Sequence, residues 1–435
     1  MATATTSVAD VCRAAKRAAR GLAQTDTAVK DAALQAIAGA LRARTDEILA
    51  ANERDMQLAR EADIGAALLD RLRLDEERIA AIARAVRQIA ALADPVGEVI
   101  DGHRLPNGLD VRKVRVPLGV VAVVYEARPN VTIDAAALCL KSGNAVVLRG
   151  SSSAMHSNAA LAQIAAEAAV AAGLPDGCVS LVAGGGREEL TELATEAGNV
   201  DLIIPRGGES LKAALQAVAT VPVIYAASGN CHVYVDASAD LDQAEAIVIN
   251  AKTQRPGVCN AVETLLVHER IAADFLPRML GSLAAAGVLV RADERTRALA
   301  DSHANTGGAA ARRAPDLLIE DATEEDWASE YLALTLAVAV VDSLEQAIEH
   351  IGRYGSGHSE AILTRDTAAA RAFQLGVDAA CVYVNASTRF TDGGEFGMGA
   401  EIGNSTQKLH ARGPIGLREL CTFKYLIEGD GHVRD

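Results

Sequence analysis

Residues 116–150 read VPLGVVAVVYEARPNVTIDAAALCLKSGNAVVLRG, and this stretch decides the fold class. Its segment 120–125 is a continuous apolar run, mostly β-branched, which is typical of a strand buried on both faces of a sheet. Segment 132–142 then has the character of a helix, and 145–149 is a second apolar strand. A strand, a helix and another strand in succession predict a mostly parallel, doubly wound α/β sheet.

The same alternation continues as far as residue 225. Glycines or serines occupy the turns that follow the strands, and ligands of parallel sheets bind there, beyond the carboxyl ends of the strands. The predicted helices are 154–172, 187–197 and 208–219, and the predicted further strands are 179–182, 201–204 and 222–225.

Other patterns flank this sheet region. Residues 1–95 are alanine-rich with helical periodicity, which predicts a helical N-terminus. Within 103–116, Asn107-Gly108 lies between alternating segments, the strongest short signal for a hairpin. This hairpin is polar on both sides, so we expect it to project and to pair with another subunit. Near the C-terminus, 422–427 is a short apolar strand.

A second α/β segment spans 233–384. We expect it to contain a strand–loop–strand around Cys259, followed by a helix near 271–286.

The composition excludes several classes of protein. Of the 435 residues, 50% are hydrophobic and 23% are charged, an ordinary globular balance. The net charge is −15 and aromatic residues make up only 3%, so the basic surface and stacking rings that bind nucleic acid are missing. No stretch reaches the roughly 18 apolar residues that span a membrane. The 7 cysteines form no CxxC pair, which favours a reduced, cytoplasmic protein.

The candidate catalytic segment is 253–267, TQRPGVCNAVETLLV. Cys259 follows a Pro256-Gly257 turn and precedes an apolar strand, which places its thiol at the edge of a loop. Main-chain amides near such a turn can stabilise a thiolate and an oxyanion. The local pattern fits a nucleophile, and it also fits a small buried hydrophobe, which is the only interpretation that the other cysteines support.

A second candidate lies at the turn Arg149-Gly150-Ser151-Ser152-Ser153, after the second strand. A cation, hydroxyl groups and a helix N-terminus together suit a phosphate group, although a serine-capped helix beside a solvated arginine has the same sequence pattern. The sequence has no strict GxGxxG, no Walker pattern, no HExxH and no GxSxG elbow. We therefore expect phosphate binding without ATP hydrolysis, and no metal site.

Three segments carry a resemblance to a known family. The stretch 116–150, the box QRPGVCNAVETLLVH at 254–268 and EFGMGAEIGNSTQKLHARGPIGL at 395–417 resemble the gamma-glutamyl phosphate reductases, a divergent branch of the aldehyde dehydrogenase superfamily. The resemblance covers nearly the whole chain. It implies an aldehyde-dehydrogenase-like α/β fold with a Rossmann-type NADPH-binding domain, an α/β catalytic domain and a small β oligomerisation flap. The implied bounds are 1–101 with 116–232 and 385–411, then 233–384, and lastly 102–115 with 412–430.

The resemblance also implies roles for single residues. Cys259 stands at the position of the nucleophile, and the Asn130 side-chain amide with the Cys259 backbone N–H would form the oxyanion hole. Glu330 would contact the nicotinamide ribose. Arg149, Gly150, Ser151 and Ser152 would hold an adenosine 2′-phosphate, while Pro205, Gly207, Gly208 and Ser210 form the pyrophosphate turn.

The anionic substrate would meet Arg255 or Arg389, with backbone amides around Gly394 binding the same anion. Surface arginines without a ligand are the alternative interpretation.

The implied reaction is the NADPH-dependent reduction of L-glutamyl 5-phosphate to L-glutamate 5-semialdehyde through a cysteine thioester, the second step of proline biosynthesis. Hydrolytic aldehyde dehydrogenases carry a glutamate base where this chain reads AASGN at 226–230. Because such a base would hydrolyse the thioester, its absence favours an acyl phosphate as substrate. A hydrolytic aldehyde dehydrogenase, an acyl-CoA reductase and a non-catalytic binding protein stay as alternatives. A homodimer or higher homo-oligomer and functional coupling to glutamate 5-kinase are the implied partnerships.

Overall fold

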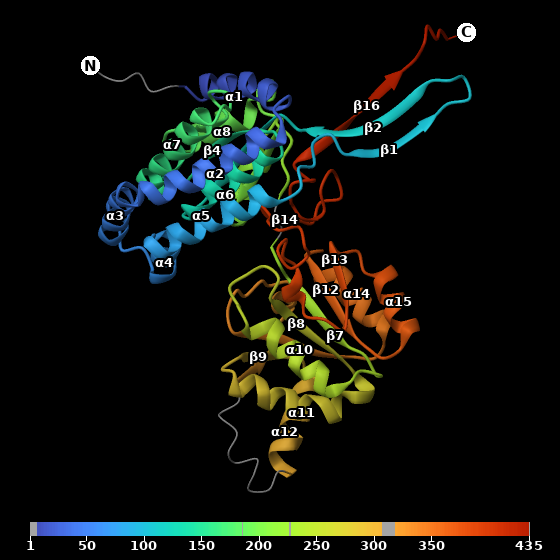
Figure 1. The fold of residues 1–435 in the computed structure, drawn as a ribbon. Helices are drawn as coiled ribbons and strands as arrows, with labels where there is room; N and C mark the ends of the chain where they lie inside the picture. Colours follow the sequence, from blue (N-terminus) through green and yellow to red (C-terminus); the bar gives the residue numbers. More distant parts are fainter. Residues whose placement is uncertain (1–6, 185, 226–227, 307–317, 435) are drawn as a thin grey trace. The chain divides into compact units, whose positions relative to one another are not determined.

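The computed structural model describes residues 7–184, 186–225, 228–306 and 318–434. The chain forms two compact units, which Figure 1 shows in colours that follow the sequence. The N-terminal unit comprises Met1–Ala226, Gly397–Gly403 and Pro414–Asp435, and the central unit comprises Ala227–Phe396 and Asn404–Gly413. The sequence-based division assigns 385–411 to the first domain, whereas only 397–403 of that segment packs with the N-terminal unit.

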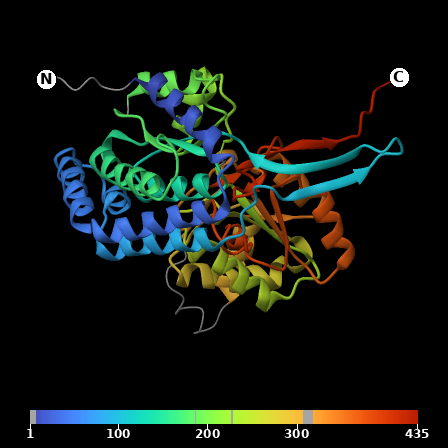
Figure 2. The same cartoon turned by 45° about the horizontal axis from the view of Figure 1, so that its top comes forward.

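The predicted helical N-terminus is confirmed. Two of its helices begin at polar caps: the Ser7 side chain accepts a hydrogen bond from the Asp10 N–H, and the Asp75 side chain accepts one from the Arg78 N–H. Helices α2 and α5 pack side by side (Figures 1 and 2). The five helices are α1 Val8–Leu22, α2 Thr27–Ala43, α3 Thr45–Glu61, α4 Ala66–Leu72 and α5 Glu76–Ala91.

A four-stranded parallel sheet forms the core of the N-terminal unit, in the order β5-β4-β3-β6. Every residue of β3 is buried, as its apolar run predicted. The predicted strand at 222–225 is wrong, because only an isolated bridge between Ile203 and Val223 forms there. The strands are β3 Val120–Tyr125, β4 Ala145–Arg149, β5 Val179–Leu181 and β6 Leu202–Arg206. The helices are α6 Asn130–Lys141, α7 Met155–Ala171, α8 Arg187–Thr195 and α9 Glu209–Val218, with a 3-10 turn η1 at Ser152–Ala154.

The strand order creates a switch point in this sheet. From β3 the chain moves outward to β4 and β5, and it then returns to place β6 on the other side of β3. Open α/β sheets bind ligands at the carboxyl ends of the two strands on either side of such a reversal, which here are β3 and β6. In this chain, Asn130 follows β3 and the Gly207-Gly208 turn follows β6.

The central unit contains a seven-stranded sheet in the order β10-β9-β11-β8-β7-β12-β13, with all described pairs parallel. The predicted strand–loop–strand around Cys259 is wrong in its first part, because helix α10 precedes the loop. The predicted helix near 271–286 is confirmed as α11. The strands are β7 Cys231–Val235, β8 Val262–His268, β9 Leu289–Ala292, β10 Ile319–Asp321, β11 Thr335–Val341, β12 Ser359–Leu363 and β13 Cys381–Val384. The helices are α10 Leu241–Thr253, α11 Glu269–Ala285, α12 Glu294–Thr306, α13 Glu324–Trp327, α14 Leu344–Tyr354 and α15 Thr367–Gly376, followed by a 3-10 turn η3 at Thr388–Phe390.

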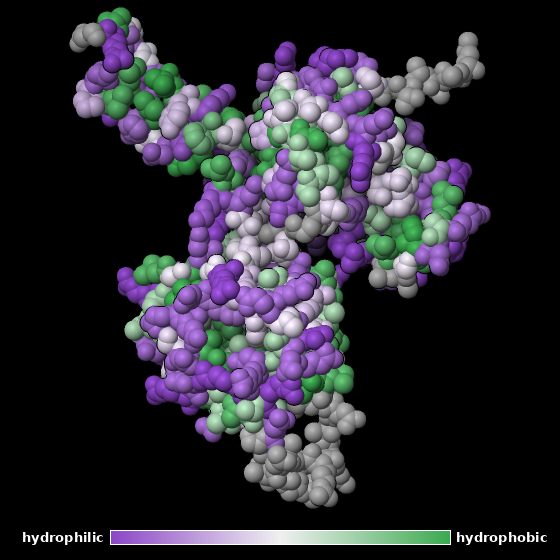
Figure 3. All heavy atoms as spheres, turned by 180° about the vertical axis from the view of Figure 1, so that it is seen from behind, coloured by the Kyte–Doolittle hydropathy of each residue, from purple (hydrophilic) through white to green (hydrophobic). Residues whose placement is uncertain are grey.

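The predicted hairpin is confirmed and belongs to a three-stranded antiparallel ribbon, β1-β2-β16, which extends from the helices of its own unit (Figures 1 and 2). Its strands are β1 Val99–Arg104, β2 Asp110–Pro117 and β16 Cys421–Glu428. Gly108 adopts φ 97°, which glycine tolerates at a tight turn. Phe423, Tyr425 and Ile427 are 46%, 56% and 60% exposed, and Figure 3 shows apolar residues among hydrophilic ones along this ribbon. Apart from it, β14 Asn404–Ser405 pairs with β15 Gly413–Pro414.

In the described part of the chain, no helix has both the length and the apolar character needed to cross a membrane.

Candidate active site

Cys259 differs from the other cysteines in its exposure. It is half-buried on the loop between α10 and β8, whereas the other six cysteines are buried, and all seven are free thiols. The Pro256-Gly257 turn lies in this loop, so Cys259 belongs neither to the helix α10 nor to the strand β8. A partly exposed thiol on a loop edge can reach a ligand, as the sequence pattern predicted.

The first residue of β7 and the segment just before this strand contact the backbone of Cys259. The buried Cys231 thiol donates a hydrogen bond of 3.2 Å to the Cys259 carbonyl oxygen. Gly229 packs so closely that an added Cβ atom would lie 1.5 Å from the same oxygen. Residues 226 and 227, part of the stretch predicted to lack a base, lie outside the described residues, and 228–230 contain no carboxylate.

Glu330 lies beside this segment. Its carboxylate accepts a hydrogen bond of 2.7 Å from the Gly229 N–H. The structure therefore brings Glu330, for which the resemblance implies contact with the cofactor, to Gly229, the residue that packs against the Cys259 backbone. Gly229 and Cys231 were not predicted as site residues, and their only signal is the short AASGNC run before a predicted strand.

Two arginines share the surroundings of Cys259. Burial lowers the pKa of the Arg389 guanidinium, the nearby positive charge of Arg255 lowers this pKa further, and the Cys259 sulfur opposes the shift. The Arg389 Nε donates to the Gln254 side chain at 2.8 Å, whereas Arg255 is exposed. Like charges held near one thiol favour an anionic ligand, because an anion relieves their mutual repulsion.

The Gly394 amide, which is predicted to bind the substrate anion, has a partner in its own loop. Its N–H donates to the Asp392 carboxylate at 2.8 Å, closing a local turn. In this structure the amide is thus engaged within its own loop.

Asn130 begins helix α6, directly beyond the carboxyl end of β3. Its side-chain amide donates to the Asp134 carboxylate at 2.9 Å, one helical turn later. Burial raises the pKa of Asp134 to about 6, while the Asn130 bond and the charge of Arg206 oppose this rise. Asn130 belongs to the N-terminal unit and Cys259 to the central unit, so their shared oxyanion hole stays a prediction.

The predicted 2′-phosphate turn closes around Arg149 at the end of β4. Arg149 is 8% exposed, and its guanidinium donates to the Gly186 carbonyl at 2.7 Å. Gly150 has no room for a side chain, since an added Cβ would lie 2.1 Å from the Asn158 amide nitrogen. The Ser151 hydroxyl oxygen accepts a hydrogen bond from the Ser153 N–H. Ser152 is the first residue of the 3-10 turn η1. A cation and hydroxyls thus meet at one turn.

The predicted pyrophosphate turn follows Pro205, which pairs with Val124 of β3. A Cβ atom at Gly207 would lie 2.8 Å from the Glu126 side chain, and the Gly208 N–H approaches the Glu126 carboxylate at 3.4 Å. Helix α9 starts at the next residue, and exposed Ser210 lies in its first turn. This turn therefore lies at the switch point, beside the loop that leads to Asn130.

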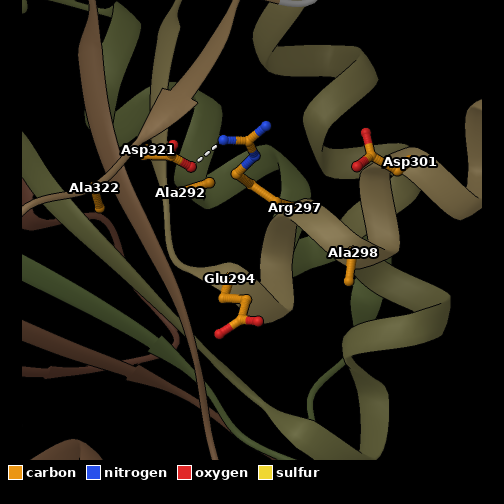
Figure 4. A pocket seen from close by; sticks show the side chains of 7 residues that line it. All are labelled: Ala292, Glu294, Arg297, Ala298, Asp301, Asp321 and Ala322. Atoms are coloured by element: carbon orange, nitrogen blue, oxygen red, sulfur yellow. Dashed lines mark hydrogen bonds and ion pairs between the residues drawn. The ribbon is translucent and has the colours of Figure 1, made fainter.

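A surface cavity of about 450 Å³ lies elsewhere in the central unit (Figure 4). An ion pair between Arg297 and Asp321 crosses its wall. Its lining contains no predicted site residue, so the assignment of the site rests on the geometry around Cys259. The cavity is lined by Ala292, Glu294, Arg297, Ala298, Asp301, Asp321 and Ala322.

Comparison with known proteins gives consistent matches. The model of the aldehyde dehydrogenase family matches residues 1–300. The chain is 56% identical to the gamma-glutamyl phosphate reductase of Thermobifida fusca over 427 residues, covering 98% of each chain. It is 56% identical to that of Moorella thermoacetica over 420 residues, covering 97% of each.

A solved structure agrees with these sequence matches. The crystal structure of gamma-glutamyl phosphate reductase from Thermotoga maritima is similar with a TM-score of 0.93 and 45% identity, covering 98% of this chain and 100% of that one. The predicted aldehyde-dehydrogenase-like α/β fold is therefore confirmed.

Proposed function

Because the chain belongs to the gamma-glutamyl phosphate reductases of the aldehyde dehydrogenase family, we propose that it reduces L-glutamyl 5-phosphate to L-glutamate 5-semialdehyde with NADPH, releasing phosphate. This is the second step of proline biosynthesis. The observation that carries the proposal is the half-buried Cys259 thiol on a loop shared with Arg255 and electrostatically close to Arg389.

The reaction begins at the thiol. The Cys259 thiolate attacks the 5-acyl carbon, a tetrahedral oxyanion forms, and the C–O bond to phosphate breaks to leave a thioester. Phosphate leaves as a stable anion, so no strong general acid is needed. The Asn130 amide and the Cys259 N–H stabilise the oxyanion, an interaction worth about 3 kcal/mol per donor.

The second half of the reaction reduces the thioester. When bound, the nicotinamide supplies the hydride. The same oxyanion donors then stabilise the thiohemiacetal, whose C–S bond breaks to return the Cys259 thiolate and release the aldehyde. The amine of the product closes onto its aldehyde without the enzyme and gives 1-pyrroline-5-carboxylate.

The residues of the N-terminal unit suit a nicotinamide dinucleotide. Glycine is required at 150 and 207, where a Cβ would collide with the side chains of Asn158 and Glu126, so the backbone of each turn is not covered by a side chain of its own. The turn after β6 lies at the switch point of the sheet. Arg149, Ser151 and Ser152 would hold the 2′-phosphate of NADPH, which NADH lacks. Pro205, Gly207, Gly208 and Ser210 would hold the pyrophosphate, and Glu330 the nicotinamide ribose.

The substrate anions would meet the two arginines. Arg389, fixed by Gln254, suits the phosphate that must lie beside the attacking thiol, and exposed Arg255 adds charge at the rim. For Gly394 to join them, its amide must leave Asp392.

The reverse reaction tests the proposed function. With the semialdehyde as substrate, NADP⁺ reduction should require phosphate or arsenate, because only these anions resolve the thioester. Coenzyme A in place of phosphate identifies an acyl-CoA reductase. Equal rates without any anion would overturn the proposal in favour of a hydrolytic dehydrogenase.

We extend the proposal to the setting of the enzyme. A homo-oligomer assembled through the β1-β2-β16 ribbon, a cytoplasmic location and functional coupling to glutamate 5-kinase, which makes an unstable acyl phosphate, fit the chemistry of the reaction.

A further inference from the structure

Asn260, directly after the nucleophile, joins two loops that lie far apart in the sequence. Its side-chain amide donates to the carbonyl of Thr391 at 2.9 Å and to that of Arg389 at 3.3 Å. In return, the Thr388 hydroxyl donates to the Asn260 carbonyl at 2.7 Å. Asn260 is 5% exposed and Thr388 is fully buried, so these bonds are shielded from water.

The partner segment is itself anchored to the sheet. The Thr391 hydroxyl lies 2.6 Å from the Ser359 hydroxyl of β12 and 2.7 Å from the Tyr383 hydroxyl of β13. These bonds attach the turn η3, which carries Arg389, to the sheet. The hydrogen bonds of Asn260 then connect the Cys259 loop to this turn.

The side chain of Asn260 has an energetic cost. Its Oδ1 atom is buried and has no hydrogen-bond partner in the described residues. A buried acceptor without a partner destabilises the fold, so an apolar side chain would serve better if only packing mattered. What Asn260 adds is its two donors, and both go to the segment that carries Arg389.

We propose that Asn260 and Thr388 are positioning residues that set Arg389 relative to the Cys259 thiol, and thereby build the subsite for the phosphate group. This inference rests on the proposed function, in which Cys259 is the nucleophile and phosphate leaves beside it. Neither residue touches the substrate; both act through Arg389.

The test is the reverse reaction with Thr388→Val, which keeps the shape of the side chain and removes its donor, against Thr388→Ser, which keeps the donor. We expect the KM for phosphate to rise about tenfold in Thr388→Val with a smaller change in kcat, and to recover in Thr388→Ser. Asn260→Ala should raise the same KM, whereas the exposed control Asn250→Ala should not.

Alkylation of Cys259 gives a second readout that does not need turnover. The alkylation ratio is the rate of reaction with anionic iodoacetate divided by the rate with neutral iodoacetamide. We expect this ratio to be higher in the wild-type protein than in Thr388→Val, because a displaced Arg389 no longer attracts the anion. Thermal unfolding checks that each variant is folded at the assay temperature.

The outcomes separate the two proposals. Suppose that the wild-type enzyme requires phosphate, but that Thr388→Val has the same KM for phosphate and the same alkylation ratio as the wild type. This result would overturn the positioning role and leave the proposed function intact. A wild-type enzyme that works equally well without phosphate would overturn the proposed function itself.

Discussion

At residue 229 the fold leaves no space for any side chain, because the backbone of Cys259 occupies it. We expect Gly229→Ala to displace the nucleophile and to lower kcat by about 100-fold, since misplacements near 1 Å have costs of that order. Steady-state kinetics with purified protein measures the loss.

Gly281→Ala is the matched control, because an added Cβ at this position in α11 meets nothing within 4 Å. It should keep full activity and stabilise the protein by about 0.5–1 kcal/mol. Full activity in Gly229→Ala would show that the Cys259 backbone adjusts without consequence.

Cys259→Ser should abolish turnover while NADPH binding persists, because a hydroxyl is a far weaker nucleophile than a thiolate. Cofactor fluorescence titration beside the activity assay separates the two effects. Retained turnover would refute the assignment of the nucleophile.

Arg149→Gln should raise the KM for NADPH about tenfold and leave that for NADH unchanged, because the charge meets only the 2′-phosphate. Initial rates with both cofactors measure the difference. Arg17→Gln, a change on α1 away from the turn, is the control. An equal rise with both cofactors would mean that Arg149 supports the turn and does not select the phosphate.

Among the elements, helix α6 carries a partly buried carboxyl group, that of Asp134, which makes stability depend on pH. The pKa of Asp134 rises from 3.8 to about 6 on folding, so the folded state holds this proton more tightly than the unfolded chain. The free energy of unfolding therefore falls as pH rises between these values, and the penalty persists above them.

Asp134→Asn removes this penalty and can still accept the Asn130 bond. We expect the variant to gain about 3 kcal/mol relative to the wild type between pH 3.5 and 7. Urea unfolding across that range measures it. A difference in stability that does not change with pH would contradict the raised pKa.

Local signals predicted most of the elements. The apolar run of β3 and the Asn107-Gly108 turn each determine their structure through neighbours in sequence, and both are confirmed. The helix α10 was missed, because alternating apolar residues such as Ile247 and Ile249 also fit a strand. At 222–225 the apolar pattern was strand-like, but the segment forms only one bridge to β6.

Local sequence signals predicted fewer of the contacts in the candidate active site. The resemblance pointed to Cys259 and Asn130 by position, yet the partners of Asn260 lie about 130 residues further along the chain. Nothing in the local sequence encodes which carbonyl groups a buried amide will meet. The close approach of Gly229 to Cys259 likewise arises only when β7 and β8 pair.

For the whole molecule, the ribbon makes a testable surface. Phe423, Tyr425 and Ile427 alternate along β16, so they share one face, and β16 is an edge strand of its sheet. Replacing all three with serine should shift the protein toward monomers in sedimentation velocity, because the apolar face then no longer favours burial. Lys424→Ser, on the opposite face, should leave the distribution unchanged. A monomeric wild-type protein would contradict the oligomer.

The pairing of β2 with β16 also has a consequence for how the protein is made. Asp110 lies opposite Glu428, so one edge of β2 has no partner until almost the entire chain has been translated. At roughly 5–20 residues per second, that edge waits on the order of 15–60 s on the ribosome. During this interval a nascent chain exposes a bare strand edge to its neighbours in the polysome. Because an unpaired strand edge can pair with another chain, we expect aggregation to compete with folding until β16 is available.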